Sequence, residues 1–198
     1  MKKQQNCFLK STIKGTCLLL FLLLSMQLHA QKPKKISKSD WTYSLDLALA
    51  HPDSITHLSL RKQNLDSIPI SILELSNLQY LDLSKNQIDT LPEWLRSMRV
   101  LKHIDLSQNQ IRNLPNWMEE WDLLEVLIIN RNPISELNPK LVGCMSLKFI
   151  DAWGTEINQL DPSFVKMEQL LVLDLQSINM SQSRQQELIR WVSKNTKL

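Results

Sequence analysis

A spacing of 23 residues governs this chain from Ile55 onward, because apolar residues recur at that interval in five separate columns. The columns stay in line through five or six copies without one inserted residue. Their members are Ile55, Leu78, Leu101, Leu124, Leu147 and Leu170; Leu58, Leu81, Ile104, Leu127, Ile150 and Leu173; Leu60, Leu83, Leu106, Ile129, Ala152 and Leu175; Leu65, Ile88, Ile111, Ile134, Ile157 and Met180; and Ile68, Leu91, Leu114, Leu137 and Leu160. A fixed period of roughly 20–50 residues predicts a stack of repeats, since one such unit cannot bury its apolar side alone.

The alternation of residues in the second copy predicts a strand at its centre. Leu81 and Leu83 are two positions apart, so an extended backbone turns both to one side, which we expect to be the interior. Tyr80, Asp82 and Ser84 then point to the opposite side. Because the positions repeat every 23 residues, the outward side chains of successive copies are predicted to form columns across one shared surface.

A polar column marks the point where each copy turns away from its strand. Its members are Gln63, Asn86, Asn109, Asn132 and Thr155. A buried amide at this point is expected to hydrogen-bond backbone groups of the turn and of the next repeat, because buried polar groups need partners.

The return leg of the copies begins at a Leu-Pro step, as in Leu91-Pro92 and Leu114-Pro115, where proline fixes φ for a turn or helix start. Two further apolar columns are expected to pack the convex side beneath the strands. They hold Ile72, Leu95, Met118, Leu141 and Phe164, and Leu75, Met98, Trp121, Cys144 and Met167. Trp94 and Trp117 follow the Leu-Pro steps and are predicted to stack on one flank, either as packing between repeats or as a second binding edge.

The copy from Leu78 to Leu101 resembles the leucine-rich repeat family in its 23-residue form, L-x-x-L-x-L-x-x-N-x-L-x-x-L-P-x-x-I-x-x-L, as in Ras-suppressor-like and many bacterial exported members. The resemblance covers roughly residues 55–180. It implies an α/β solenoid with a parallel concave sheet of about six strands, short convex helices and helical caps at both ends. The last copies depart from the pattern at Asn138, Ala152 and Ile178, and we interpret the change at Ile178 as the end of the array.

Residues 1–30 are interpreted as a secretory signal peptide. Four lysines precede a dense apolar run from Cys17 to Leu28, and Ala30 supplies a small residue for cleavage. The run is about a dozen residues long, shorter than the roughly 20 of a membrane span, so an uncleaved anchor is the weaker alternative. We therefore expect an exported protein, periplasmic or extracellular, without stable membrane insertion after cleavage.

The remaining segments divide into a tail, two caps and the array. Residues 31–38 are predicted to be a basic flexible tail, 39–54 an N-terminal cap helix, 55–180 six repeats and 181–198 a C-terminal cap helix. Asp40 is the expected N-cap of the first helix, which His51-Pro52 ends. Ser183 and Gln186 fit a capping box for the second. Both helices are expected to shield the core.

Charge and cysteine usage exclude some classes of function. All four lysines of residues 1–30 leave with the signal, and four more lie in the tail, so the chain from Ser39 onward has a net charge of −5. This balance argues against nucleic acid, which requires a basic surface on the folded body. Cys144 is the one cysteine left after cleavage, so no intramolecular disulfide is possible and stability must come from core burial.

The sequence holds no catalytic, cofactor-binding or metal-binding motif, and we predict that the protein is not an enzyme and has no cofactor. Its three glycines form no phosphate-binding loop. His57 and His103 share an outward column but lie two strands apart, about 10 Å, which is too far for one zinc ion. Cys144 falls in a convex core column and is interpreted as a small hydrophobic residue.

The outward strand positions carry the functional hypothesis. One column holds four aspartates, interpreted either as ordinary solvated repeat positions or as an acidic stripe that steers a basic partner or a cation. Near the C-terminal end the neighbouring columns become apolar and aromatic, a composition typical of binding surfaces, although the C-terminal cap or a loop could cover them. The predicted partner-binding residues are Tyr80, Asp82, His103, Asp105, Val126, Ile128, Phe149, Asp151, Trp153, Val172 and Asp174.

The sequence therefore predicts a binding module for a protein partner whose identity, like the oligomeric state, is left open. The alternative is a structural or adhesive envelope protein without a single specific partner, using its Lys-rich tail on acidic surfaces. Three triplets, Asp53-Ser54-Ile55, Asp66-Ser67-Ile68 and Asp89-Thr90-Leu91, also resemble acceptor sites for O-linked glycans in exported bacterial proteins.

Overall fold

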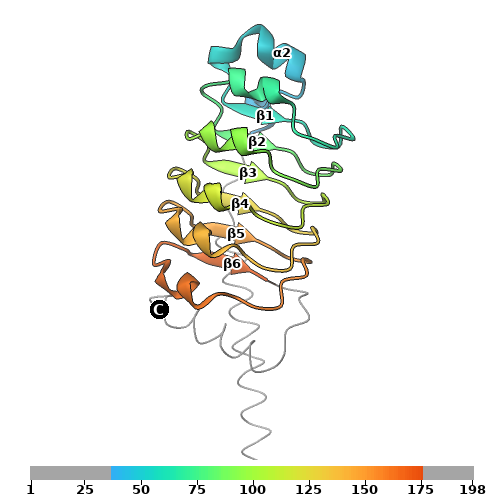
Figure 1. The fold of residues 1–198 in the computed structure, drawn as a ribbon. Helices are drawn as coiled ribbons and strands as arrows, with labels where there is room; N and C mark the ends of the chain where they lie inside the picture. The colour runs from blue at the N-terminus through green and yellow to red at the C-terminus, as the bar shows by residue number, and fades with distance from the viewer. Residues whose placement is uncertain (1–36, 176–198) are drawn as a thin grey trace, which may run out of the picture. The chain divides into compact units, whose positions relative to one another are not determined.

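The computed structural model describes residues 37–175, which form a stack of coils (Figure 1). Six strands make one sheet, in which each strand pairs in parallel with the next along the chain. They are β1 (His57–Ser59), β2 (Tyr80–Asp82), β3 (His103–Asp105), β4 (Val126–Ile128), β5 (Phe149–Asp151) and β6 (Val172–Asp174). Leu58 pairs with Leu81, and Leu81 with Ile104, so the register equals the predicted 23-residue period. The predicted α/β solenoid with six parallel strands is confirmed.

Short 3-10 helices cover the side of the sheet opposite its open face. They are η3 (Ile70–Glu74), η4 (Glu93–Ser97), η5 (Asn116–Glu120), η6 (Pro139–Gly143) and η7 (Pro162–Lys166). Proline precedes or begins each of them, so its fixed φ sets the direction of the return leg. The predicted convex helices are thus present as tight single turns.

The N-terminal cap begins later than predicted. A 3-10 turn, η1, spans Lys38–Asp40, and Thr42 then forms a parallel bridge with Leu58 at the edge of the sheet. The Thr42 amide donates to the His57 carbonyl at 3.0 Å, which holds the backbone extended and excludes a helix at this point. Asp40 is therefore not the N-cap. The bridge also pairs part of the β1 edge, which would otherwise be open.

The cap helix itself is α2, Leu45–Ala50, followed by the 3-10 turn η2, Pro52–Ser54. Ser44 is its N-cap, with an oxygen that accepts from the Leu47 amide at 3.4 Å. Ala48 is fully buried, and Leu45 and Leu49 pack against the core. The predicted shielding role of this cap is confirmed.

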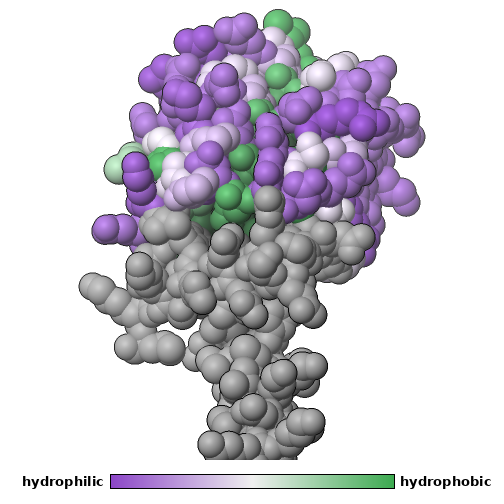
Figure 2. Space-filling view, turned by 60° about the horizontal axis from the view of Figure 1, so that its bottom comes forward, coloured by the Kyte–Doolittle hydropathy of each residue, from purple (hydrophilic) through white to green (hydrophobic). Residues whose placement is uncertain are grey.

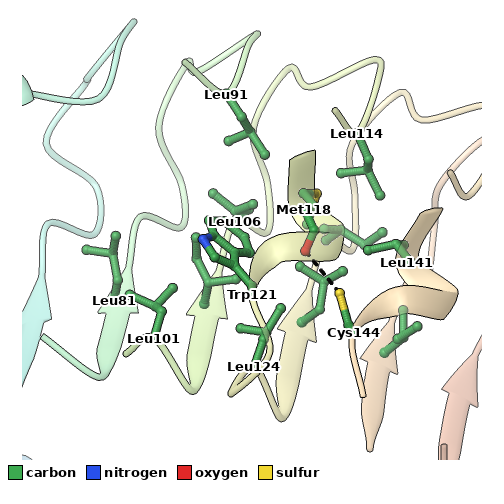
Figure 3. Close-up of a cluster of buried hydrophobic side chains, with 14 of the residues drawn as sticks. Leu81, Leu91, Leu101, Leu106, Leu114, Met118, Trp121, Leu124, Leu141 and Cys144 are labelled. Atoms are coloured by element: carbon green, nitrogen blue, oxygen red, sulfur yellow. Dashed lines mark hydrogen bonds between the residues drawn. The ribbon is translucent and has the colours of Figure 1, made fainter. Parts of the chain in front are cut away.

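The core is one continuous cluster built from the predicted columns. The middle residue of each strand belongs to it, as do the convex columns (Figure 3). Trp121 is fully buried, and its indole N–H donates to the Leu95 carbonyl at 3.2 Å. Cys144 lies in the same column, and its thiol donates to the Met118 carbonyl at 3.1 Å. Burial raises the pKa of the Cys144 thiol to about 12, so it packs as the small hydrophobic residue that the sequence predicted.

A ladder of three buried asparagines joins successive turns. The Asn109 amide nitrogen donates to the carbonyls of Leu83 and Leu106, at 3.0 and 2.9 Å, and its oxygen accepts from the Ile88 amide at 3.1 Å. Asn86 and Asn132 make the equivalent bonds. The predicted bonds are confirmed for the three asparagines, with two corrections: the neighbour that each asparagine contacts is the preceding repeat, and Gln63 is exposed and donates to the Tyr43 carbonyl instead.

Each turn after a strand passes through left-handed backbone at the same position. Lys62, Lys85, Gln108, Arg131 and Gly154 have φ values between 53° and 67°. Glycine adopts this conformation without strain, whereas a residue with a Cβ atom does so at a cost of about 1–2 kcal/mol. The array therefore carries repeated local strain that its packing holds in place.

The terminal segments lie outside the described residues. These are residues 1–36 and 176–198, so the predicted signal peptide, most of the basic tail and the C-terminal cap helix are outside the structure's scope. Within residues 37–175, no helix is long and apolar enough to cross a membrane.

Candidate functional site

The open face of the sheet, turned away from the core, presents three columns of side chains. The first residue of each strand forms column one: His57, Tyr80, His103, Val126, Phe149 and Val172. The third residue forms column two: Ser59, Asp82, Asp105, Ile128, Asp151 and Asp174. Column three follows two positions later and holds Arg61, Ser84, Ser107, Asn130 and Trp153. All eleven predicted binding residues therefore lie on this one face.

Aromatic rings contact one another along the N-terminal half of column one. His57 and Tyr80 stack in parallel, with centroids 4.2 Å apart and planes 3° apart. His103 continues the row at 6.0 Å from Tyr80, and Trp41 meets the edge of His57 at 5.5 Å. Such ring pairs add about 0.5–1.5 kcal/mol beyond their burial. We call Trp41, His57, Tyr80 and His103 the aromatic row.

The two histidines of the row are neutral at pH 7. Burial lowers the pKa of His103 to about 4, partly opposed by the nearby Asp82 carboxylate, while His57 lowers it further. Burial also lowers the pKa of His57, against the attraction of Asp40. A neutral imidazole offers one hydrogen-bond donor and one acceptor, so the row combines apolar ring surface with polar edges.

The aspartates of column two support the backbone. One oxygen of Asp82 accepts from the Ser84 amide at 2.9 Å, and Asp105 and Asp151 accept from the amides two residues further on in the same way. The second oxygen of Asp82 accepts from the Ser59 hydroxyl at 3.1 Å, and that of Asp151 accepts from the side-chain Nδ2 of Asn130 at 2.7 Å. These bonds favour a structural role for the acidic column over an open stripe that attracts cations.

Asp105 shows the electrostatic cost of this arrangement. Burial raises its pKa, and the paired Asp82 raises it further, while its bonds to Ser107 and the charge of Arg61 lower it. Arg61 also donates to the Ser84 hydroxyl at 2.8 Å, next to the aspartates. The exposed Arg61 is thus a counter-charge at the N-terminal end of the face.

The apolar patch predicted near the C-terminal end is mostly covered. Val126, Phe149 and Val172 are each less than a tenth exposed, although they lie outside the core cluster. Ile128 and Trp153 are half-buried. Three of the five residues are therefore buried, and only Ile128 and Trp153 keep accessible surface. Figure 2 shows one side of the molecule, where a narrow hydrophobic band runs between hydrophilic flanks.

Trp153 is held in place by Arg131. The Arg131 guanidinium carbon lies 4.5 Å from the centroid of the indole ring, and the Arg131 amide donates to the Trp153 carbonyl at 2.9 Å. A cation over an indole face contributes about 0.5–2 kcal/mol. The two side chains form a second aromatic site at the rim of the open face.

Sequence reasoning missed Trp41 as a member of the aromatic row. Trp41 falls within residues 39–54, which the sequence predicted to be a cap helix, and the bridge at Thr42 that aligns this segment with β1 has no strong local signal. The stacking predicted for Trp94 and Trp117 takes another form. Both pack against the core, and Trp117 meets Trp121 edge-on at 5.2 Å. This favours packing over a second binding edge.

The described residues offer little chemistry of another kind. Among residues 37–175, no group of three His, Cys, Asp or Glu side chains is placed to hold a metal ion. In two of the Asp-Ser/Thr triplets the exposed hydroxyl donates to the preceding carboxylate, from Ser67 to Asp66 at 2.9 Å and from Thr90 to Asp89 at 3.1 Å.

The geometry defines a class of protein: a parallel-stranded repeat solenoid in which one face of the sheet is turned away from the core. A leucine-rich repeat family model matches residues 53–111, and this match together with the fold supports the leucine-rich repeat family. Proteins of this family generally mediate protein–protein binding. No curated protein is significantly similar to the chain.

Solved structures share the fold. A leucine-rich repeat protein of Leptospira interrogans is 25% identical with a TM-score of 0.68, over 73% of this chain and 36% of that one. An internalin of Listeria monocytogenes is 18% identical with a TM-score of 0.55, over 72% and 38%. The ectodomain of the Arabidopsis thaliana receptor kinase GASSHO1/SCHENGEN3 is 28% identical with a TM-score of 0.51, over 64% and 15%. The matched part thus spans well under half of each of these proteins.

Proposed function

We propose that this protein binds a protein partner on the open face of its sheet, with the aromatic row as the principal anchor. The carrying observation is that His57, Tyr80 and His103 are half-buried and in ring contact, so their positions are fixed while their edges stay accessible. Preorganised aromatic side chains lose little entropy on binding and dominate interface energetics.

The rest of the face supplies the surroundings of the anchor. Ile128 and the Arg131–Trp153 pair are the accessible contacts towards the C-terminal end, and Arg61 is an exposed charge at the other. A standard interface uses roughly 20–30 residues a side, so the open face with its flanking loops is large enough for one partner. The Arabidopsis ectodomain was solved in complex with CASPARIAN STRIP INTEGRITY FACTOR 2, which supports partner binding by a similar array.

Export is the second part of the proposal. Four lysines, a dense apolar run from Cys17 to Leu28 and Ala30 follow one another in the order of a cleavable secretory signal. The protein is then periplasmic or extracellular. Mass spectrometry of the protein purified from cells that express the complete reading frame tests this, and an N-terminus at Gln31 is expected. A retained Met1 would contradict cleavage.

Site-specific photo-crosslinking tests the binding face. A photoreactive amino acid placed at Tyr80 is expected to capture one defined partner in cells, while the same group at the exposed Arg112, in a turn away from the face, captures none. With the partner identified, Tyr80→Ala is expected to raise the dissociation constant at least about tenfold, the effect of losing roughly 1.4 kcal/mol at a central aromatic residue.

The control is Leu123→Ala, which removes an exposed apolar side chain outside the open face and should leave the affinity unchanged. Thermal melting of both variants checks that they fold. Equal capture at positions 80 and 112, with binding that moderate salt abolishes and Tyr80→Ala does not alter, would favour the adhesive alternative.

A further inference from the structure

A row of long polar side chains follows the carboxyl ends of the strands. It occupies one position in five successive repeats, held by Lys62, Lys85, Gln108, Arg131 and Gly154. The amide of each of the first four donates to the carbonyl that precedes the next member, at 2.9–3.0 Å, so the members are neighbours. All five have left-handed backbone, with φ between 53° and 67°, so the side chains of the first four leave their coils in the same direction. We call Lys62, Lys85 and Arg131 the cation rim.

The three cations of the rim are exposed, and within the part of the chain that the structure describes they form no ion pair. Other cations of the array pair with glutamates at 2.6–3.3 Å; these are Arg96, Arg99, Lys140 and Lys148. Asp66 and Asp89 lie four residues after the two lysines, yet neither pairs with them. The rim therefore presents positive charge that the described array does not neutralise.

The turn itself does not require a cation at this position. Gly154 occupies it in the last of the five repeats, and glycine adopts left-handed backbone more readily than a residue with a Cβ atom. Lys62, Lys85 and Arg131 adopt the same conformation against that preference. Strained backbone positions concentrate at binding sites, where the strain accompanies a useful placement of the side chain. The pattern therefore indicates a use for these side chains outside the turn.

Arg131 is already held in position for such a use. Its side chain passes Gly154, where a Cβ atom would lie 3.5 Å from the Arg131 Cγ, and its guanidinium carbon lies 4.5 Å from the centroid of the Trp153 ring. This contact uses the face of the guanidinium, and no described residue accepts a hydrogen bond from its N–H edge. A guanidinium edge binds a carboxylate through two parallel hydrogen bonds. Arg131 is therefore a preorganised carboxylate-binding group beside the open face.

The length of the rim and the charges around it favour a short acidic stretch of protein as its occupant. Lys62 and Arg131 are three strand spacings apart, about 14 Å, which roughly four or five residues of extended chain span. The uncharged Gln108 interrupts the rim, and the exposed Asp66 and Asp89 follow it, so a long uniform polyanion would meet repulsion as well as attraction. Because the chain from Ser39 onward has a net charge of −5, it attracts an acidic segment only at a local cluster of this kind.

We propose that the cation rim binds an acidic segment of the protein partner, with carboxylates on Lys62, Lys85 and Arg131 while the rest of the partner lies on the open face. The rim adjoins column three, since Lys62 follows Arg61 and Arg131 follows Asn130 along the chain. A partner on the open face therefore reaches the rim without leaving the sheet. The inference rests on the proposed function and deepens it by naming the chemistry of the partner.

Selection of random peptides displayed on phage, with the immobilised protein as bait, tests the proposal. The protein is purified from cells that express the complete reading frame, and the wild-type chain is expected to enrich peptides with clustered Asp and Glu residues. The rim variant, Lys62→Gln with Lys85→Gln and Arg131→Gln, copies the residue that Gln108 already places at this position with a φ of 56°, so the fold accommodates it. For an enriched peptide, fluorescence anisotropy should give a dissociation constant at least about tenfold higher in the rim variant.

The matched control is Lys102→Gln with Arg112→Gln and Lys166→Gln. It removes the same charge from cations outside the rim that, like those of the rim, form no ion pair with a described residue. It should bind the peptide like the wild type, and the lysines of residues 31–38 are the same in every variant. Circular dichroism verifies that each variant is folded. Enrichment of peptides without acidic residues, or equal affinity in the two triple variants, overturns the proposal.

Tyr80→Ala separates the failure of this inference from the failure of the proposed function. Peptides that lose affinity with Tyr80→Ala and not in the rim variant would uphold the open face and overturn the rim. Acidic peptides that respond to the rim variant and not to Tyr80→Ala would support the rim alone. Dextran sulfate is the polyanion probe: if it binds the wild type and not the rim variant while no acidic peptide is enriched, the rim binds a sulfated polymer and the proposal of an acidic protein segment is overturned.

Discussion

Asn109→Ala is the substitution that tests the physical basis of the stack most directly. Asn109 is 7% exposed, and its side chain makes three bonds of 3.1 Å or less to backbone groups, two in the preceding repeat and one in its own turn. Alanine leaves the carbonyls of Leu83 and Leu106 and the amide of Ile88 without these partners. A buried group that loses its bond costs about 1–3 kcal/mol, and relaxation with water entry recovers part of it. We expect a loss of about 3–5 kcal/mol in the free energy of unfolding.

Urea denaturation followed by tryptophan fluorescence and by circular dichroism measures this loss. The fluorescence and circular dichroism transitions should coincide as long as the repeats stay coupled, because a coupled array unfolds as one unit. Separate transitions would show that the repeats unfold independently. Asn109→Thr is a graded variant: Thr155 occupies the same column, and its hydroxyl donates to the Ala152 carbonyl at 2.8 Å, so threonine should retain one bond and lose less stability. The neighbouring exposed Gln110→Ala should change stability by no more than about 0.5 kcal/mol.

A cost below about 1 kcal/mol for Asn109→Ala, or an equal cost for Gln110→Ala, would refute the reasoning. Either result would mean that the ladder is not what couples the repeats. The apolar columns alone would then have to account for the cooperativity.

Two further predictions concern backbone strain and acid. Lys85→Gly should stabilise the fold by about 0.5–1 kcal/mol, and Gly154→Ala should destabilise it by about 1–2 kcal/mol, in denaturant melts, because both positions are left-handed, with φ 59° and 67°. The pKa of His103 is lowered to about 4 in the fold, so the unfolded chain binds the His103 proton more tightly. The contribution of His103 to the free energy of unfolding is therefore fully present above pH 6.5. It falls by on the order of 2 kcal/mol as the pH drops from there towards 4. His103→Phe should remove this loss between pH 6.5 and 5. The raised pKa of Asp105 works in the opposite direction in both chains, and an unchanged acid slope would count against the assignment.

The repeat period predicted a stack in register, and the family resemblance implied that the stack is a parallel-stranded solenoid. Since each copy of 23 residues repeats the same apolar positions, the register of all six strands follows from one measured spacing. Asn86, Asn109 and Asn132 were also predictable, because a polar residue in an otherwise apolar coil must find backbone partners. The period specifies which residues of adjacent repeats are paired, and those pairings determine the strand register and the core columns.

The N-terminal cap was harder to predict because it lies outside the period. Asp40 looked like an N-cap, yet Ser44 takes that role once Thr42 pairs with the edge of β1. The segment around Thr42 can either begin a helix capped by Asp40 or stay extended and pair with β1. The outcome depends on a contact with Leu58, sixteen positions further along the chain, which local propensity does not report.

The site was predictable in position but not in accessibility. Alternation placed Tyr80, Phe149 and Val172 on the open face, and all three lie there. It could not say that Phe149 and Val172 are covered while Tyr80 is half-exposed, because accessibility depends on what packs over a face as well as on which face a residue occupies. The sequence also made the aspartates look like a charged surface, whereas Asp82 and Asp151 use both oxygens within the fold.

This division of roles indicates where selection for a partner can act on such a scaffold. The middle strand residue and the turn asparagine are fully committed to the stack, and the aspartate of column two is committed to the amide that follows it. The side chains of column one do not make this kind of bond to the backbone of their own turn. The column therefore changes from His and Tyr to Val and Phe along the array while the strand register stays the same. A recognition surface requires side chains that do not hold the backbone together and are still fixed in position by their neighbours. The aromatic row meets both requirements and the acidic column does not, so the proposed function is placed on the aromatic row.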